Sequence, residues 1–326
     1  MSIRLPTLLL PALVAGLLAA PTASAKPGYR VGMGDQNKKM FAHKSFKALE
    51  LERVRYIVSW DAGVDARQFR EVGGYLLAAR RARKEVLVAF GARRGCFTGR
   101  YAAAKRCRAP GLRAYRSAFR AFRKRYPWVK TFSPWNEANH VSQPTYRRPG
   151  LAAAYYDQVR RNCRGCKIVA LDVLDSRNML AYIGGFVRGT KGKPRIWGIH
   201  NYADVNRLRS SATRAILSRV PGEVWMTETG GLVAFGPSFP YDRRRAASRT
   251  HRMFRLADAY DTRRSGMRSR ITRLYPYQWT GVKRRARFDA GLVSPSGSPP
   301  AGALGLQAVR APTAEVELAP QLRITH

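Results

Sequence analysis

The fold is decided by the stretch Val129-Lys130-Thr131-Phe132-Ser133-Pro134-Trp135-Asn136-Glu137. Its first half is rich in β-branched and aromatic residues, which is typical of a short buried strand. A proline and polar residues follow, so the strand is expected to end near Asn136. A second stretch of the same design, Val224-Trp225-Met226-Thr227-Glu228, also ends in a glutamate. The sequence therefore predicts two strands that each carry a glutamate at the carboxyl end.

Strand-like runs of this kind alternate with helical patterns along the chain. The runs span residues 29–34, 55–60, 86–90, 130–135, 167–172, 196–200, 223–228 and 272–279. Between them apolar residues recur at spacings of three and four, which predicts helices over 112–126, 151–159, 179–187, 208–217 and 246–259. Eight strand–helix units in about 280 residues predict an α/β fold, a single-domain (β/α)8 TIM barrel. An open doubly wound sheet is less favoured, because no glycine-rich phosphate loop follows the first run.

The two ends of the chain differ from this pattern. Residues 1–25 have a basic start, an apolar run and the small-residue motif Ala23-Ser24-Ala25, which predicts a signal peptide. A membrane anchor is the alternative, but the apolar run is interrupted by Pro11 and falls short of the roughly 20 residues that span a bilayer. We expect a catalytic-type domain over 26–310 with a short last helix at 301–309, a C-terminal tail over 311–326, and a secreted protein without an integral membrane segment.

The chain is strongly basic, with 60 Lys and Arg against 20 Asp and Glu, a formal charge of +40. Such a charge favours acidic partners. No zinc-finger, helix-turn-helix or RNA-binding signature accompanies it, so no specific nucleic-acid partner is predicted. Two interpretations stay open: an arginine-rich solvated surface, or a surface that binds anionic cell-wall polymer and holds the protein at the wall.

Four cysteines occur in two pairs. Cys96 and Cys107 bracket a loop, and Cys163 and Cys166 form a Cys-x-x-Cys motif. One interpretation of the second pair is a redox motif or half of a zinc-binding site. Because an extracellular chain favours structural disulfides, we expect bridges 96–107 and 163–166.

In a (β/α)8 barrel, functional residues lie at the carboxyl ends of the strands. The predicted strands end in polar and aromatic residues: Asp35, Gln36 and Asn37; Trp60 and Asp61; Arg93 and Arg94; Asn136 and Glu137; Asp172 and Asp175; His200, Asn201 and Tyr202; Glu228; and Gln278 and Trp279. This end is thus acidic and aromatic in a chain that is otherwise basic. That contrast predicts a site at this end of the barrel.

Glu137 and Glu228 fall on the fourth and seventh strands, which face one another across the mouth. Two strand-end carboxylates are the groups that cleave a glycosidic bond, and they lie about 5–5.5 Å apart when configuration is retained. The acid needs a raised pKa, which we expect Trp135 and Phe132 to provide as apolar neighbours.

Other residues of this end are candidates for supporting roles. Tyr202 and His200 are candidate donors to the nucleophile, and Trp279 and Trp60 offer flat faces to sugar rings. Asp35 is a further candidate for substrate binding. A metal cluster of His200, Asp172 and His140 is an alternative, but no metal-binding spacing supports it, so neither metal nor cofactor is predicted.

The chain resembles the clan A glycoside hydrolases, the "4/7" superfamily of (β/α)8 enzymes, over residues 29–310. The resemblance rests on Trp135-Asn136-Glu137, His200-Asn201-Tyr202, Thr227-Glu228-Thr229-Gly230, Trp279 and the loop Phe288-Asp289-Ala290-Gly291-Leu292-Val293. It implies that Glu137 is the acid/base, Glu228 the nucleophile, and that configuration is retained. It also implies that Asn136 binds the sugar 2-hydroxyl, that Tyr202 orients Glu228, and that Trp279 forms the floor of the subsite beside the cleaved bond.

The chain departs from that family in three places. Many members carry an arginine late in strand two that supports the nucleophile, whereas this chain has Ser59-Trp60 there. A histidine near strand three or four and an Arg-Pro-Ala start to the last helix are also missing. The sequence thus predicts a retaining β-glycosidase acting on a poly- or oligosaccharide. The alternatives are a catalytically silent barrel that binds glycan, and a basic secreted protein that binds anionic wall polymer or nucleic acid.

Overall fold

The computed structural model describes residues 27–93, 95–96, 107–283 and 286–296. The predicted signal peptide, the helix expected at 301–309, the C-terminal tail and Arg94 lie outside these residues. Within the described part of the chain, none of the helices has the length and apolar character needed to cross a membrane.

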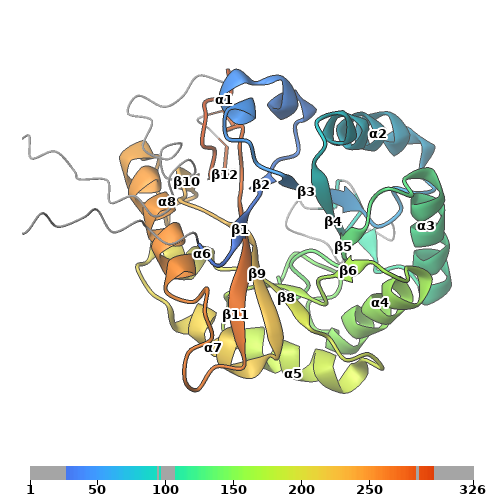
Figure 1. Cartoon of the computed structure of the whole chain (residues 1–326). Coiled ribbons are helices and arrows are strands. Elements are labelled where there is room, and N and C mark those ends of the chain that lie inside the picture. The colour runs from blue at the N-terminus through green and yellow to red at the C-terminus, as the bar shows by residue number, and fades with distance from the viewer. Residues whose placement is uncertain (1–26, 94, 97–106, 284–285, 297–326) are drawn as a thin grey trace, which may run out of the picture.

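Parallel strands form the centre of the fold and follow the order expected for a barrel (Figure 1). One five-stranded sheet has the order β1 (Arg30–Val31), β11 (Ser269–Pro276), β9 (Gly222–Thr229), β8 (Ile196–His200) and β7 (Asp172–Leu174). The other has the order β2 (Met33–Gly34), β3 (Arg53–Ser59), β4 (Glu85–Gly91), β5 (Thr131–Ser133) and β6 (Lys167–Ile168). All eight predicted strand positions are therefore strands.

The two sheets are related through the first and fifth predicted strands, each of which is divided. In the first, β1 pairs with β11 and β2 pairs with β3. In the fifth, β6 pairs with β5 and β7 pairs with β8. The strand order is thus that of a (β/α)8 barrel, but the ladder is interrupted at two places and the barrel is not one closed sheet.

Helices cover the outside of the strands. The long ones are α2 (Ala66–Arg81), α3 (Leu112–Arg125), α4 (Pro149–Asn162), α5 (Met179–Gly189), α7 (Ser211–Arg219) and α8 (Arg243–Asp258). The short ones are η1 (Lys38–Ala42), α1 (Lys44–Lys47) and α6 (Tyr202–Asn206). The five predicted helices are confirmed, with shifts of a few residues at most ends, while α2, η1, α1 and α6 were not assigned from the sequence.

Helix α3 shows how the apolar pattern builds the core. Phe119 and Phe122 are buried, and their rings meet the rings of Phe90 and Phe132 edge-on at centroid distances of 5.2–6.3 Å. Edge-to-face pairs at this distance stabilise beyond the area they bury. The arginines of the opposite face are exposed, apart from the half-buried Arg123, as the spacing predicts.

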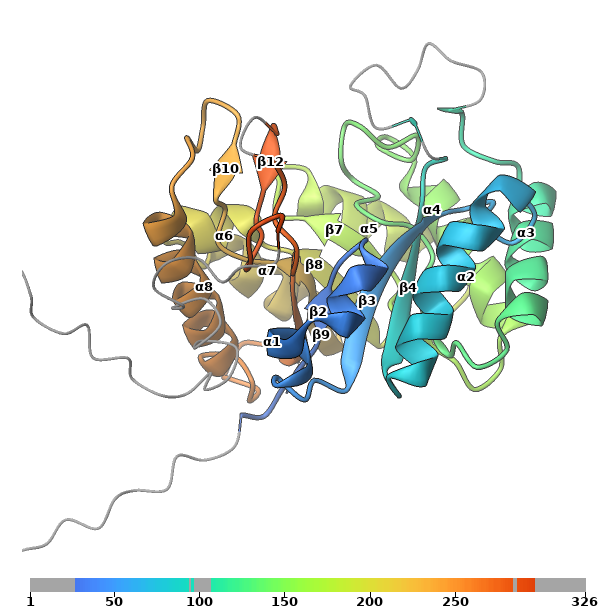
Figure 2. The ribbon, with the colours of Figure 1, turned by 90° about the horizontal axis from the view of Figure 1, so that it is seen from above.

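A small antiparallel ribbon stands beyond one end of the barrel (Figure 2). It pairs β10 (Ala234–Phe235) with β12 (Phe288–Asp289). The strands it follows, β9 and β11, are neighbours in the barrel. The ribbon therefore rises next to the carboxyl ends of these strands, where a site is expected.

Both expected disulfides are present. Cys96 is joined to Cys107, and Cys163 to Cys166. The first bridge follows β4 and the second closes the turn between α4 and β6.

Candidate active site

Glu137 and Glu228 come together at the mouth of the barrel, from the loop after β5 and from β9. One carboxylate oxygen of each and a ring nitrogen of His200 all lie within 4.8 Å of one another. This spacing matches the short separation of retaining glycosidases, about 5–5.5 Å, rather than the about 6.5–9.5 Å of inverting ones.

The backbone at Glu137 is strained. Its φ is 48°, in the left-handed region that non-glycine residues rarely adopt. Such a conformation costs about 1–3 kcal/mol and persists only where the surroundings impose it. Here Ala138 N donates to Asp172 O at 3.0 Å and Asn136 N donates to Phe90 O at 2.6 Å. These bonds from both flanking residues hold the turn and aim the Glu137 side chain into the mouth.

Arg55 is the residue that the sequence interpretation missed. It lies on β3 with a fully buried side chain, and its Nη1 donates to Glu228 Oε2 at 2.6 Å. Its Nη2 donates to Asp172 Oδ2 at 3.3 Å and also to Asn136 Oδ1. The expectation that strand two lacks a supporting arginine was therefore wrong.

The error has a simple physical cause. The family resemblance places this arginine at the strand end, near Ser59, whereas the Arg55 guanidinium reaches the mouth from the middle of β3. An arginine flanked by Val54 and Tyr56 in a buried strand is itself unusual, because charged residues are seldom fully buried unless paired. Although burial opposes its charge, the facing Glu228 and Asp172 hold the pKa of Arg55 above its ordinary value.

Tyr202 and His200 contact different glutamates. Tyr202 Oη donates to Glu228 Oε1 at 3.3 Å, the orienting contact that was expected. His200 Nδ1 lies 3.2 Å from Glu137 Oε1 and 3.9 Å from Glu228 Oε2. The expected role of His200 as a donor to Glu228 is therefore replaced by a hydrogen bond with Glu137.

The pKa values of His200 and Glu137 depend on each other. Burial lowers the pKa of His200, but the facing Glu228 and Glu137 carboxylates outweigh it and raise this pKa overall. Burial raises the pKa of Glu137, but the hydrogen bond and charge of His200 bring it below its ordinary value. Because the two groups are in contact, they titrate as a pair.

The expected apolar neighbours of Glu137 are absent from its surroundings. Trp135 is buried, stacks on Tyr155 at 5.1 Å and donates to Gln143. Phe132 lies in the core beneath α3. The prediction that these two rings raise the pKa of Glu137 was therefore wrong, because Phe132 packs on Phe119 of α3 and Trp135, beyond the end of β5, packs on Tyr155.

The glutamates open into a cavity of about 690 Å³. Asn136, His140, Asp175 and Arg207 line its polar part. Leu232, Phe235, Phe239 and Phe288, from the β10–β12 ribbon and its connections, form an apolar wall. A concave site with an apolar wall and a few convergent polar groups is the form that small-molecule sites usually take.

Three candidates from the sequence lie elsewhere. Trp279 is fully buried, and its ring packs on His43 and Phe46 at 5.4 Å each, so it does not floor a subsite. Trp60 packs against the core with the Arg93 guanidinium 5.3 Å from its ring centroid, away from the residues that line the cavity. Asp35 does not line the cavity; it is buried, accepts from Thr280 N and Asn37 N, both at 2.6 Å, and lines a separate hollow with Gln36 and Glu71.

Tyr277 stands where Trp279 was expected. It lies just beyond the last residue of β11 and lines the cavity that contains both glutamates. Tyr202 Oη also lies 3.4 Å from its carbonyl oxygen. The sequence interpretation was thus two residues out of register at the end of the eighth strand.

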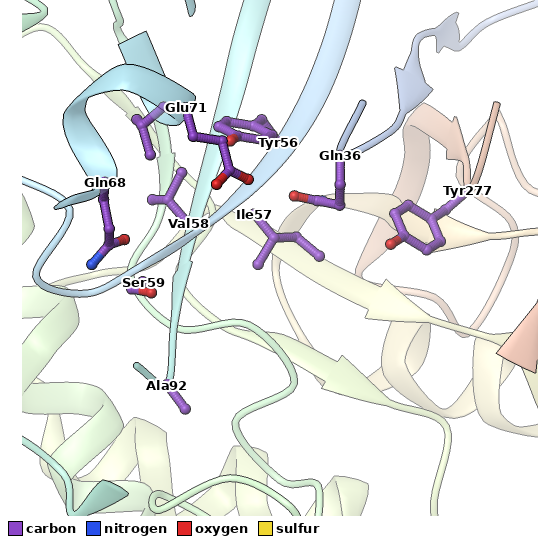
Figure 3. A pocket seen from close by; sticks show the side chains of 10 residues that line it. Gln36, Tyr56, Ile57, Val58, Ser59, Gln68, Glu71, Ala92 and Tyr277 are labelled. Carbon is purple, nitrogen blue, oxygen red and sulfur yellow. The ribbon is translucent and has the colours of Figure 1, made fainter. Parts of the chain in front are cut away.

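A second hollow, of about 280 Å³, adjoins the cavity (Figure 3). Ile57 and Tyr277 line both. Figure 3 shows Gln68 and Glu71 of α2 on one side of this hollow, and Gln36 and Tyr277 on the other. The mouth therefore extends from the glutamates towards α2.

Glu137, His200 and Glu228 also have a spacing that a metal ion requires. A cation at this point would face the buried Arg55 guanidinium, which already donates to Glu228 Oε2 at 2.6 Å. Two like charges in a buried site repel one another strongly. The donor set therefore fits proton transfer better than metal binding.

Comparison with known proteins gives fold neighbours only. No known family and no curated protein matches the sequence. Among solved structures, a family 39 glycoside hydrolase from the gut symbiont Bacteroides cellulosilyticus WH2 has 15% identity and a TM-score of 0.55, covering 87% of this chain. This chain spans 63% of that protein's length.

Two further solved structures match this chain over nearly their whole length. Xylanase 10B from Thermotoga maritima has 13% identity and a TM-score of 0.57, over 87% of this chain and 95% of the xylanase. A GH5-4 endoglucanase from Clostridum cellulovorans has 14% identity and a TM-score of 0.57, over 86% and 93%. The fold is therefore a (β/α)8 barrel, similar to the barrels of these glycoside hydrolases.

Proposed function

We propose that this protein is a secreted glycosidase that cleaves β-glycosidic bonds with retention of configuration. The observation that carries the proposal is the close approach of the Glu137 and Glu228 carboxylates, within 4.8 Å. Their different partners support different roles. Arg55 and Tyr202 contact Glu228, whereas His200 contacts Glu137.

In the first step, a Glu228 carboxylate oxygen attacks the anomeric carbon. Glu137 gives its proton to the glycosidic oxygen, so that bond breaks and the leaving group departs as an alcohol. In the second step, Glu137 takes a proton from water as the water oxygen attacks the same carbon. Glu228 is released as a carboxylate, and the sugar leaves with its original configuration.

The contacts of Glu228 suit the role of nucleophile, whereas the His200 contact lowers the pKa of Glu137 in the free protein, opposite to the raised value expected of the acid. Arg55 offers Glu228 a fixed, buried cation, which positions the carboxylate and balances its charge. When Glu228 becomes an ester, its negative charge disappears while Arg55 keeps its charge. The field at Glu137 then becomes more positive, which favours the ionised carboxylate that the second step requires.

The shape and lining of the mouth support a β-linked poly- or oligosaccharide as substrate. The apolar wall with Phe235 and Phe288 offers ring faces to sugar C–H groups. The adjoining hollow, with Gln36, Gln68 and Glu71, adds amide and carboxylate groups that suit further hydroxyls. The names of the neighbours, which include xylanases and an endoglucanase, point in the same direction.

Secretion rests on the expected signal at residues 1–25 and on two disulfides, which are typical of extracellular chains. The test of the whole proposal is hydrolysis of aryl β-glycosides, β-glucans and β-xylans by the wild type, Glu137→Ala and Glu228→Ala. We expect each variant to lose several orders of magnitude in kcat/KM for its substrate, with an unchanged circular dichroism spectrum. Binding of glycan without turnover by the wild type would instead identify a silent barrel.

A further inference from the structure

A hollow lined almost entirely by cations lies on the outside of the barrel, away from the glutamates. It has a volume of about 560 Å³ and lies between α3 and α4. Its lining residues are Arg120, Arg123, Lys124, Arg161, Asn162 and Arg164. We call this hollow the cationic groove.

The groove lies at the end of the barrel opposite the active site. Each outer helix of a (β/α)8 barrel runs back from the carboxyl end of one strand to the start of the next. The groove residues lie in the second half of α3 and at the end of α4, which lead into β5 and β6. An occupied groove would therefore leave the mouth open.

The cations of the groove have no acidic partner in the part of the chain that the structure describes. Among the described residues, none of the four arginines or Lys124 forms an ion pair. The nearest acid along α4 is Asp157, which is buried and accepts from Thr190 Oγ1 and Lys191 N at 3.1 and 2.8 Å. Five like charges thus converge, and no carboxylate of the described residues pairs with them.

The fold holds several of these cations in place. Arg123 Nη1 donates to Val129 O at 2.6 Å, and its side chain is half-buried. That burial lowers the pKa of Arg123, so an anion at this point would be stabilising. Arg161 Nε donates to Asp157 O at 3.2 Å, and the Cys163–Cys166 disulfide closes the turn that presents Arg164.

A simpler explanation accounts for part of the pattern only. Cations in the last turn of a helix interact favourably with its dipole, which suits Lys124 and Arg161. Arg120 lies more than a turn before the end of α3, and Arg164 lies beyond the end of α4. The helix dipole therefore does not explain why these two join the groove.

We propose that the cationic groove binds an anionic polysaccharide and holds the enzyme on it while the active site faces away. Guanidinium groups bind carboxylate, sulfate and phosphate oxygens through paired hydrogen bonds. Proteins that bind single-stranded nucleic acid also stack bases on aromatic side chains, and no aromatic side chain lines the groove. The lining thus favours a polysaccharide over a nucleic acid.

The test compares two variants with the same loss of charge. The groove variant carries Arg120→Gln, Lys124→Gln, Arg161→Gln and Arg164→Gln, and it keeps Arg123 because that side chain bonds to the backbone. The control carries Arg81→Gln, Arg188→Gln, Arg214→Gln and Arg244→Gln, four exposed arginines of α2, α5, α7 and α8. Affinity for heparin and for a DNA single strand is measured at several salt concentrations.

We expect the groove variant to bind heparin at least about tenfold more weakly at 0.15 M salt and to show a shallower salt dependence. The control is expected to change much less. Equal losses in both variants would overturn the proposal in favour of diffuse charge, as would no binding of heparin by the wild type. A loss confined to DNA would overturn the polysaccharide in favour of a nucleic acid.

Thermal unfolding by circular dichroism checks that both variants fold. If the groove variant does not, the double variant Lys124→Gln/Arg164→Gln replaces it, with Arg81→Gln/Arg244→Gln as its control. Hydrolysis of a neutral soluble glycoside is expected to be unchanged in the groove variant. This result keeps the test separate from the assignment of Glu137 and Glu228.

Discussion

The guanidinium of Arg55 lies 2.6 Å from the carboxylate of Glu228, and both groups are buried. The same guanidinium also donates to Asp172 at 3.3 Å. Arg55 thus connects the second, fifth and seventh barrel strands at the level of the proposed nucleophile. We therefore expect this arginine to contribute both to stability and to the proposed reaction.

Replacement of Arg55 is expected to separate these two contributions. Arg55→Met leaves two buried carboxylates without a cation, which typically costs about 3–5 kcal/mol. Arg55→Lys keeps the positive charge but replaces the planar guanidinium with a single ammonium group. It is therefore expected to fold with a smaller loss of stability than Arg55→Met. Urea unfolding and kcat/KM of both variants measure the two effects. A stable and fully active Arg55→Met would contradict the proposed role.

The second prediction concerns the pH dependence of stability. Burial and the neighbouring Asp204 charge raise the pKa of Asp175, a residue that lines the cavity, to about 7. The pKa of an unfolded aspartate is about 3.9. Between this pKa and the raised pKa of the folded state, the folded state binds more protons than the unfolded state. The free energy of unfolding is therefore expected to fall as pH rises from about 4 to about 7.

The substitution Asp175→Asn removes this titration while keeping an acceptor for Asp204 N. The stability of the wild type relative to Asp175→Asn is thus expected to be highest near pH 4 and to decrease towards pH 7. Urea unfolding of both proteins at several pH values measures the difference. A difference that is independent of pH would show that Asp175 is not a buried acid of raised pKa.

The third prediction concerns the hollow next to the cavity. Glu71 lies on the exposed side of α2 and lines this hollow. Glu71→Trp is expected to fill it and to lower kcat/KM for long oligosaccharides, with little effect on a short aryl glycoside. Leu77→Trp, at an exposed position of the same helix, serves as the control. If Glu71→Trp lowers activity on both substrates equally, the hollow does not hold substrate.

The fourth prediction concerns Trp279 and Tyr277. Because Trp279 is buried against α1, Trp279→Ala is expected to cost about 3–5 kcal/mol of stability. The milder Trp279→Phe should fold with an unchanged KM, whereas Tyr277→Ala should raise KM, because Tyr277 lines the cavity. Substrate kinetics of the two variants test this exchange of roles. If only Trp279→Phe raised KM, Trp279 rather than Tyr277 would contact the substrate, as the family resemblance implies.

The sequence predicted the strands well because buried parallel strands are short apolar runs, and such runs between helical patterns have few other structural interpretations. The same pattern predicted Glu137 and Glu228 as site residues, since both lie at the carboxyl ends of such runs, and the structure brings their carboxylates together. Arg55 was missed because a long side chain can act at a distance from its own position along the strand. The left-handed backbone of Glu137 and the two-residue strands of the β10–β12 ribbon leave no sequence pattern, because neighbouring segments impose them.

The most direct test of the central claim is the anomeric configuration of the first-formed product. Proton NMR recorded during the first minutes of hydrolysis of a β-glycoside distinguishes the two anomers before they interconvert. A pair of carboxylates within 4.8 Å predicts that the β-anomer appears first. Initial release of the α-anomer would contradict the assignment of Glu228 as the nucleophile.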